Sequence, residues 1–121
     1  MDIILIIDDQ PHLRELFSEV LNDEGYMVDS VGDIDSARRY FKNSKPDLVL
    51  LDLYLKGFEG WDLLHDIKIQ YPHLPVIITT AYDSYVHDPR VSKADGYVVK
   101  SLYALDGLKQ KIAEFLEKRT P

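Results

Sequence analysis

The sequence predicts an α/β fold, in which a doubly wound parallel sheet of five strands carries helices on both faces. Two observations lead to this prediction. Short apolar segments recur five times along the chain, and the stretches between them place apolar residues at helical spacing. The five segments are Ile3–Ile7, Tyr26–Val31, Leu48–Leu51, Val76–Thr79 and Tyr97–Val99.

Four of these segments are continuous apolar runs rich in Val and Ile. Strands of this kind are typical of parallel sheets that are covered by helices on both faces. The exception is Tyr26–Val31, which includes Asp29 and Ser30. Polar residues inside a strand suit an edge position, so we expect this segment to lie at one edge of the sheet.

Helical spacing marks three of the intervening stretches and the stretch that follows the last segment. The first has Asp9 or Gln10 as its cap, Pro11 in its first turn and Gly25 at its end. The second begins after Asp33, which is a suitable N-cap. The four apolar stripes are Leu13, Leu16, Phe17, Val20 and Leu21; Ile34, Ala37 and Phe41; Trp61, Leu64, Ile67 and Tyr71; and Leu105, Leu108, Ile112, Phe115 and Leu116. The segment 83–95 keeps no clear period and contains Pro89, so we expect at most a short helix there.

Length, composition and charge limit the kinds of function open to this chain. Its 121 residues suit one domain, because a domain usually takes roughly 100–200 residues. It has no cysteine, which excludes disulfides and thiol chemistry. The net charge of −7 disfavours direct binding to nucleic acid, and no apolar run is long enough to span a membrane. We therefore expect a soluble, cytoplasmic single domain over residues 1–121.

Acidic residues follow two of the predicted strands, and a lysine follows the last. Asp8 and Asp9 come directly after the first strand, Asp52 after the third and Lys100 after the fifth. The carboxyl ends of parallel strands share one edge of the sheet, where ligands bind in folds of this kind. Clustered carboxylates repel one another unless a cation lies among them, and carboxylates with phosphate oxygens are typical ligands of Mg²⁺. The pattern predicts a magnesium site suited to phosphoryl transfer, with Lys100 beside it.

These residues, in this order, resemble the receiver domain of two-component response regulators. The resemblance rests on Asp8-Asp9, Asp52, Thr80-Ala81 and Lys100, and it covers nearly the whole chain. Gly57, Gly60 and Tyr97 also match habits of that family. The resemblance implies a flavodoxin-like sheet with strand order 2-1-3-4-5.

The resemblance also implies a role for each site residue. Asp52 would accept a phosphoryl group from a sensor histidine kinase or a phosphotransfer protein. Asp9, Asp52 and the main-chain carbonyl of Tyr54 would bind Mg²⁺, and Asp8 would act largely through bound water. Lys100 would pair with one phosphoryl oxygen. Thr80 would donate a hydrogen bond to another, and it is favoured over Thr79 because Ala81 follows it.

Phosphorylation would then switch a protein-interaction face. In the family that the sequence resembles, Thr80 moves and Tyr97 rotates inward, which alters the face built from the last two helices and the fifth strand. This face would contact a downstream protein or an output domain missing from the chain, and it is also available for dimerisation. We expect no output domain within residues 1–121. We also expect no enzymatic activity beyond the chain's own phosphorylation and dephosphorylation.

Three departures from the family pattern carry predictions of their own. Ser101 replaces the proline that usually follows the lysine in a cis peptide bond. A cis bond before a non-proline residue costs about 2.5–4 kcal/mol, so we expect a trans bond or a strained cis bond. Lys56 replaces a frequent proline, which predicts a looser loop. Tyr54 and Tyr82 flank the expected path of the hydrolytic water, so we predict slow dephosphorylation.

Two other functions remain to be weighed. A receiver-like interaction module that is never phosphorylated is left open by Ser101. A magnesium-dependent phosphatase with an aspartyl nucleophile would need a second Asp two residues after Asp52 to act as general acid. That position is Tyr54, which cannot act as a carboxylic acid.

Overall fold

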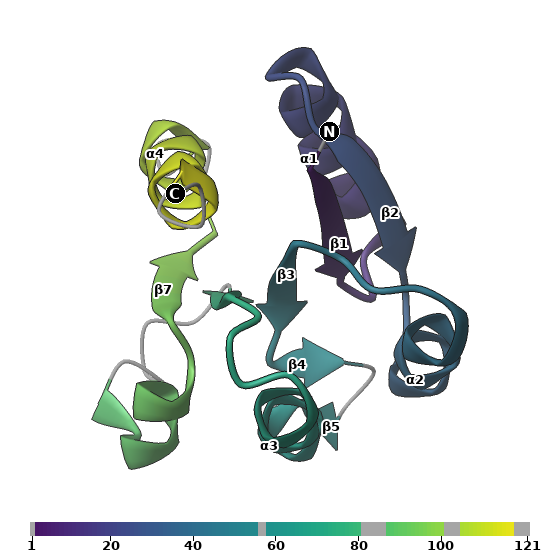
Figure 1. Cartoon of the computed structure of the whole chain (residues 1–121), viewed down its shortest axis with the longest axis vertical. Helices are drawn as coiled ribbons and strands as arrows, with labels where there is room; N and C mark the ends of the chain where they lie inside the picture. The colour runs from purple at the N-terminus through teal and green to yellow at the C-terminus, as the bar shows by residue number, and fades with distance from the viewer. Residues whose placement is uncertain (1, 56–57, 81–86, 101–104, 118–121) are drawn as a thin grey trace.

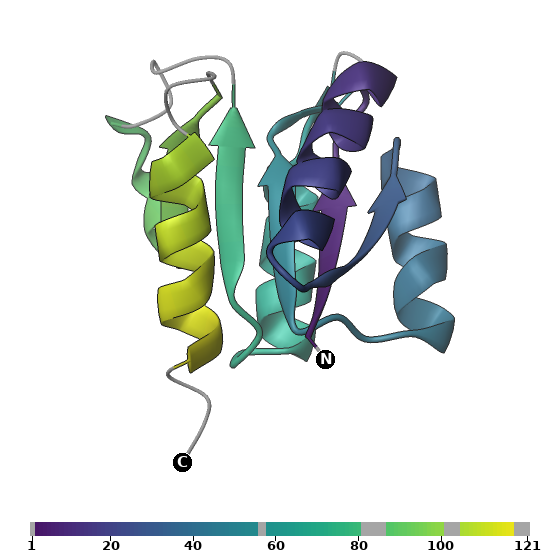
Figure 2. The same ribbon diagram turned by 90° about the horizontal axis from the view of Figure 1, so that it is seen from above.

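A computed structural model of the chain describes residues 2–55, 58–80, 87–100 and 105–117. Its centre is a five-stranded sheet in which all neighbouring strands are parallel. The strand order is β2-β1-β3-β6-β7, and the strand arrows in Figure 2 point toward the same end of the sheet. The five strands are β1 (Ile3–Ile7), β2 (Met27–Val31), β3 (Leu48–Asp52), β6 (Val76–Thr80) and β7 (Gly96–Val99).

Numbered along the chain, the five strands of this sheet have the order 2-1-3-4-5, which confirms the predicted fold class. The two additional strands, β4 (Tyr54–Leu55) and β5 (Phe58–Glu59), pair with each other in an antiparallel hairpin (Figure 1). The sequence did not predict this hairpin, because strands of two residues are too short to show a period. It follows directly after β3, next to the edge of the sheet where the acidic residues gather.

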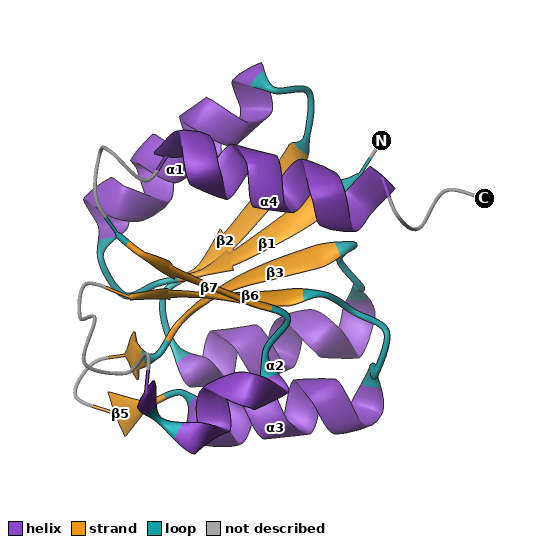
Figure 3. Ribbon diagram, turned by 90° about the vertical axis from the view of Figure 1, so that its left-hand side faces the viewer, coloured by secondary structure: helices purple, strands orange, loops and turns teal. Residues whose placement is uncertain are grey.

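Helices cover both faces of the sheet, as predicted. Figure 3 shows α1 (Pro11–Asp23) and α4 (Leu105–Glu117) on one face, with α2 (Ile34–Asn43) and α3 (Trp61–Gln70) on the other. Each face has its own apolar cluster, because alternate residues of each strand point to opposite sides. Ile4 and Ile6 of β1 pack with α1 and α4, whereas Leu5 and Ile7 pack in the cluster that includes α2 and α3.

The predicted start and glycine end of α1 and the predicted cap of α2 are confirmed. Gln10 occupies the N-cap position of α1, but its side chain makes no capping hydrogen bond. Pro11 begins α1, and Gly25 follows its end with a φ of 98°, a left-handed conformation that favours glycine. The Asp33 side chain caps α2 by accepting a 2.7 Å hydrogen bond from the Ser36 main-chain N–H. Such a cap stabilises a helix by about 1 kcal/mol.

Two further predictions are confirmed: the position of the second strand at an edge of the sheet, and the near absence of helix in the described part of the segment 83–95. Strand β2 is at an edge of the sheet, and Met27, Asp29 and Ser30 are exposed. The described part of the segment 83–95 includes the short 3-10 helix η2 (Pro89–Lys93) and no α-helix. Asp88 caps η2 through a hydrogen bond from the Arg90 N–H.

Several predictions concern residues outside those that the structure describes. The affected positions are Lys56, Gly57, Ala81, Tyr82 and Ser101, so the geometry of the Lys100–Ser101 bond is among the predictions left open. Among the described residues, no helix is both long enough and apolar enough to cross a membrane.

Candidate functional site

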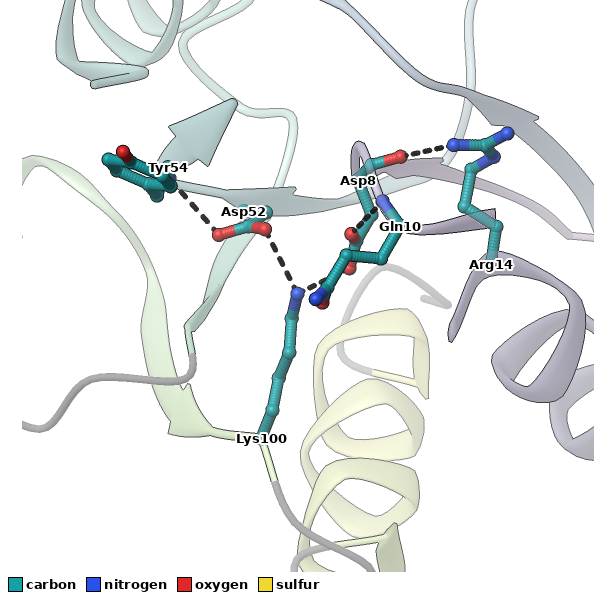
Figure 4. A network of polar contacts seen from close by, with 6 residues as sticks. All are labelled: Asp8, Gln10, Arg14, Asp52, Tyr54 and Lys100. Atoms are coloured by element: carbon teal, nitrogen blue, oxygen red, sulfur yellow. Dashed lines mark hydrogen bonds and ion pairs between the residues drawn. The ribbon is translucent and has the colours of Figure 1, made fainter. Parts of the chain in front are cut away.

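The parallel sheet brings the predicted site residues to one edge. Asp8 follows β1 and Asp52 is the last residue of β3, and these strands are neighbours in a register that pairs Ile7 with Leu51. The two carboxylates therefore start from adjacent positions. Lys100 follows β7, two strands away from β3, and its long side chain reaches back across β6 (Figure 4).

Three carboxylates meet at this edge. Oxygens of Asp8, Asp9 and Asp52 all lie within 4.8 Å of one another. Asp8 is 1% exposed and Asp52 is 5% exposed, whereas Asp9 is only partly buried. Since like charges in a buried place repel one another at low dielectric, such a cluster is costly without a cation among the oxygens.

Lys100 contributes positive charge to this cluster. Its Nζ lies 3.0 Å from Asp52 Oδ2 and also donates a hydrogen bond to Asp8 Oδ2, while its side chain is only 6% exposed. The main-chain N–H of Lys100 donates a 2.6 Å bond to the Thr80 carbonyl, which fixes the base of the lysine against β6. One ammonium is thus shared between two buried carboxylates.

Opposing effects act on the pKa of the buried Asp52 carboxyl group. Burial raises its pKa above the ordinary value of 3.8, and the neighbouring Asp8 carboxylate adds to this increase. Lys100 and the hydrogen bond from the Tyr54 N–H act in the opposite direction, but the net effect is a raised pKa. The Lys100 ammonium and the Tyr54 N–H therefore offset only part of the effect of burial on the Asp52 carboxylate.

Main-chain donors orient two of the acids. The Tyr54 N–H donates a 3.1 Å hydrogen bond to Asp52 Oδ1, and the Gln10 N–H donates a 2.9 Å bond to Asp8 Oδ1. Each acid therefore has one oxygen directed by the backbone and the other directed toward Lys100. This arrangement fixes the carboxylates before any ligand binds.

The donor set fits Mg²⁺. This cation prefers oxygen ligands and is usually held by one or two carboxylates together with water and phosphate oxygens. Asp8, Asp9 and Asp52 offer hard oxygen ligands close enough to share one ion. The magnesium site predicted from the sequence therefore has the carboxylates that it needs.

The other predicted residues lie on strands β6 and β7 of the sheet and on the hairpin that follows Asp52. Thr80 is the fully buried last residue of β6, and Thr79 beside it is 3% exposed. Tyr97 is a half-buried residue of β7 that packs against the core on the α2 and α3 side. The Tyr54 side chain is 44% exposed, and Tyr54 begins the hairpin that follows Asp52.

The sequence analysis missed one residue of the site. Arg14 of α1 donates a 2.6 Å hydrogen bond from Nη1 to the main-chain carbonyl of Asp8 (Figure 4). Its position six residues after Asp8, inside a helix, carries no recognisable motif. The signal that could have found it is that α1 begins at the acid pair, so its first turns must lie beside the site.

A five-stranded sheet of order 2-1-3-4-5 with an acid cluster and a lysine at its carboxyl edge defines a receiver-type α/β domain. The chain matches the family model of the response regulator receiver domain over residues 4–113. It therefore belongs to the response regulator receiver family, as the resemblance implied.

Curated relatives agree with this assignment. The chain is 40% identical over 79 residues to sporulation initiation phosphotransferase F of Bacillus subtilis, a match that covers 65% of this chain and 64% of the relative. It is 38% identical over 81 residues to the probable transcriptional regulatory protein TcrX of Mycobacterium tuberculosis, covering 67% of this chain and 35% of that protein. The chain thus spans less than two thirds of the length of either relative.

Solved structures show the same fold. The response regulator TrrA of Thermotoga maritima, solved in complex with Mg²⁺-BeF, is 37% identical and superimposes with a TM-score of 0.90, covering 96% of this chain and 100% of TrrA. TrrA has also been solved with the histidine kinase ThkA, and in that complex it matches with a TM-score of 0.87 over 96% of this chain and 99% of TrrA. These relatives place the chain in two-component signalling.

Proposed function

We propose that Asp52 accepts a phosphoryl group from the phosphohistidine of a sensor histidine kinase or phosphotransfer protein, in a reaction that depends on Mg²⁺. One observation carries this proposal: the buried Asp52 carboxylate lies among Asp8, Asp9 and Lys100. Asp52 accepts one hydrogen bond from the Tyr54 N–H, but it shares the Lys100 ammonium with Asp8, so one positive charge lies beside two buried carboxylates.

Asp9, Asp52 and the main-chain carbonyl of Tyr54 would hold the ion, and Asp8 would act largely through bound water. When bound, Mg²⁺ supplies positive charge that offsets the oxygens of the acids and of the incoming phosphoryl group. The raised pKa of Asp52 has burial as its main cause, so a cation at this place favours the ionised form that the reaction needs.

In the proposed reaction, an oxygen of the Asp52 carboxylate attacks phosphorus. The P–N bond of the donor breaks, and its electron pair leaves with the imidazole nitrogen. Lys100 already lies 3.0 Å from Asp52 Oδ2, so a phosphoryl group on Asp52 brings its oxygens within reach of the ammonium. Thr80 would donate a hydrogen bond to another phosphoryl oxygen. The chain's own chemistry would be limited to gaining and losing this group.

The signal would leave the site through the strands that hold Thr80 and Tyr97. Both residues belong to neighbouring strands, β6 and β7, in which Thr80 pairs with Val99. Movement at Thr80 and rotation of Tyr97 would alter the face formed by η2, β7 and α4. A downstream protein, an output domain or a second copy of the chain would bind this face.

The relatives support this proposal. TrrA has been solved both with Mg²⁺-BeF and with a histidine kinase. At 37% identity over nearly the whole chain, it is similar enough for the same chemistry to be tested here.

Incubation with a small phosphodonor and Mg²⁺, read by intact mass, tests the proposal. The expected result is one added phosphoryl group, lost when EDTA replaces Mg²⁺. No added group would favour a receiver-like interaction module that is never phosphorylated. Continued release of inorganic phosphate over many turnovers, from substrates other than the donor, would favour a phosphatase.

A further inference from the structure

The guanidinium of Arg14 binds the backbone that joins the two neighbouring acids. Its Nη1 lies 2.6 Å from the main-chain oxygen of Asp8. That carbonyl belongs to the peptide group between Asp8 and Asp9, so its orientation sets the direction in which both side chains leave the chain. The Arg14 side chain is half-buried at this place (Figure 4).

Other contacts fix the remaining polar groups of Asp8. Its N–H donates a 3.1 Å hydrogen bond to the Val31 carbonyl, and its carboxylate accepts bonds from the Gln10 N–H and from Lys100. The Asp8 carbonyl accepts its hydrogen bond from a side chain of α1, that of Arg14. Arg14 is therefore a separate determinant of the acid pair, supplied by a helix rather than by the sheet.

A glycine makes room for this contact. A Cβ at Gly32 would lie 2.8 Å from Arg14 Nη1 and 3.3 Å from its Cζ, so the guanidinium could not keep its present position and would have to shift. The φ of Gly32 lies outside the left-handed region, so its backbone does not itself require glycine. Glycine at residue 32, just after β2, thus leaves the space that the Arg14 guanidinium occupies.

We propose that Arg14, seated over Gly32, is a positioning residue that holds the Asp8–Asp9 peptide in the orientation needed to bind Mg²⁺. The inference rests on the proposed function, since it concerns the same metal site. It assigns no contact between Arg14 and the ion or the phosphoryl group. Its effect passes through the carbonyl of Asp8.

Because Arg14 is charged, its removal tests the inference clearly. A purely electrostatic role and a positioning role predict opposite changes in the affinity for Mg²⁺. Removing a cation near an acid cluster should, by Coulomb's law alone, tighten the binding of Mg²⁺. Removing a positioning residue should weaken it. For Arg14→Met we expect the Kd for Mg²⁺, measured by titration calorimetry, to rise about 10-fold, within the range known for residues that orient metal ligands.

Arg38→Met is the matched control. This variant also removes a guanidinium. In the natural chain, however, Arg38 lies on α2 and forms an exposed ion pair of 2.9 Å with Asp66. We expect its Kd for Mg²⁺ to stay within twofold of the natural chain. Thermal unfolding of both variants, followed by circular dichroism, shows whether the fold is kept.

Gly32→Ala tests the position of the Arg14 guanidinium without changing any charge. The added methyl group should displace the guanidinium and weaken Mg²⁺ binding severalfold in the natural background, but have no further effect on Arg14→Met. In metal-free protein, the amide resonance of Gln10 should shift alike in both single variants, because this N–H reports the place of the Asp8 carboxylate.

Unchanged or tighter Mg²⁺ binding by Arg14→Met would overturn the inference, as would an equal effect of Gly32→Ala in both backgrounds. Failure of the proposed function gives a different result, in which the natural chain itself binds no Mg²⁺ and gains no phosphoryl group. In that case an unmoved Gln10 resonance in both single variants would also reject the positioning role.

Discussion

The two edges of the sheet use aspartate in opposite ways. The amino edge is the end of the sheet at which the parallel strands begin, and the carboxyl edge is the end at which they finish. At the amino edge, Asp47 precedes β3 and accepts a 2.7 Å hydrogen bond from the Ile3 N–H of the neighbouring strand. Asp95 precedes β7 and accepts a 2.8 Å bond from the Val76 N–H in the same manner. The N–H of each aspartate donates back to the carbonyl of its partner residue. Each of these carboxylates closes one pair of strands.

At the carboxyl edge, the acids converge on one another instead. Asp8 and Asp52 share Lys100, and Asp9 brings a third carboxylate within 4.8 Å. At the amino edge Asp95 also binds Lys68, at 2.9 Å, but among the described residues no group of three acidic side chains gathers there. The grouping of acids around a shared lysine, rather than the presence of an aspartate that binds the neighbouring strand, therefore marks the reactive edge.

The two lysines give the largest expected difference between the edges. Lys100→Met should slow phosphorylation of Asp52 by about 10²-fold, because a donor aimed at developing negative charge is lost. Lys68→Met removes a lysine bound to a carboxylate at the other edge and should leave the rate unchanged. The rates are measured by intact mass after addition of a small phosphodonor. Equal rates for the two variants would remove Lys100 from the reaction.

The two kinds of aspartate should differ in the sign of their effect on stability. In metal-free protein, Asp95→Ala should lower the free energy of unfolding by about 1–2 kcal/mol, because the Val76 N–H and Lys68 lose their acceptor. Asp52→Asn should raise it instead, since a buried charge is removed. Urea unfolding measures both. A loss of stability in Asp52→Asn would mean that Asp52 is a structural acid like Asp95.

The stabilisation by Asp52→Asn should depend on pH. A carboxyl group whose folded pKa is raised binds its proton more tightly in the native state. Its contribution to stability is therefore lost as the pH rises above 3.8 and passes the raised value. The advantage of Asp52→Asn should be full only above the raised pKa, decline as the pH falls through it, and vanish below pH 3.8. An advantage that stays constant over this range would contradict the raised pKa.

Tyr54 gives the smallest expected effect. Its ring is 44% exposed beside Asp52 and is predicted to restrict the path of the hydrolytic water. Tyr54→Asn should shorten the half-life of the phosphorylated protein severalfold, because a smaller polar side chain admits water. Loss of phosphate is followed by intact mass after removal of the donor. The exposed Ile69 of α3 offers a control, since Ile69→Asn should leave the half-life unchanged.

The fold could be predicted because most of its strands are continuous apolar runs that stand out in the sequence. The continuous apolar runs Ile3–Ile7 and Val76–Thr79 have no other ready explanation than buried parallel strands, and the structure places both in the sheet. The hairpin β4–β5 could not be predicted, since Tyr54–Leu55 is too short to have a pattern. Its place is set by tertiary packing after Asp52 rather than by local preference.

The site was predictable in its membership but not in its detailed contacts. Parallel strands force Asp8 and Asp52 to one edge whatever else the chain does. The sequence did not predict that Lys100 binds both acids, because side-chain reach across β6 depends on the twist of the sheet. Arg14 was missed for a related reason, since it acts on a carbonyl and main-chain groups leave no trace in a sequence.

The most direct test of the whole account is to locate the phosphoryl group. Protein treated with a phosphodonor and Mg²⁺ is reduced with borohydride, which converts an aspartyl phosphate into homoserine, and its peptides are sequenced by mass spectrometry. The account predicts homoserine at residue 52 alone, and none in Asp52→Asn or in the presence of EDTA. Homoserine at residue 8, 9 or 95, or phosphate on a hydroxyl or histidine side chain instead, would contradict it.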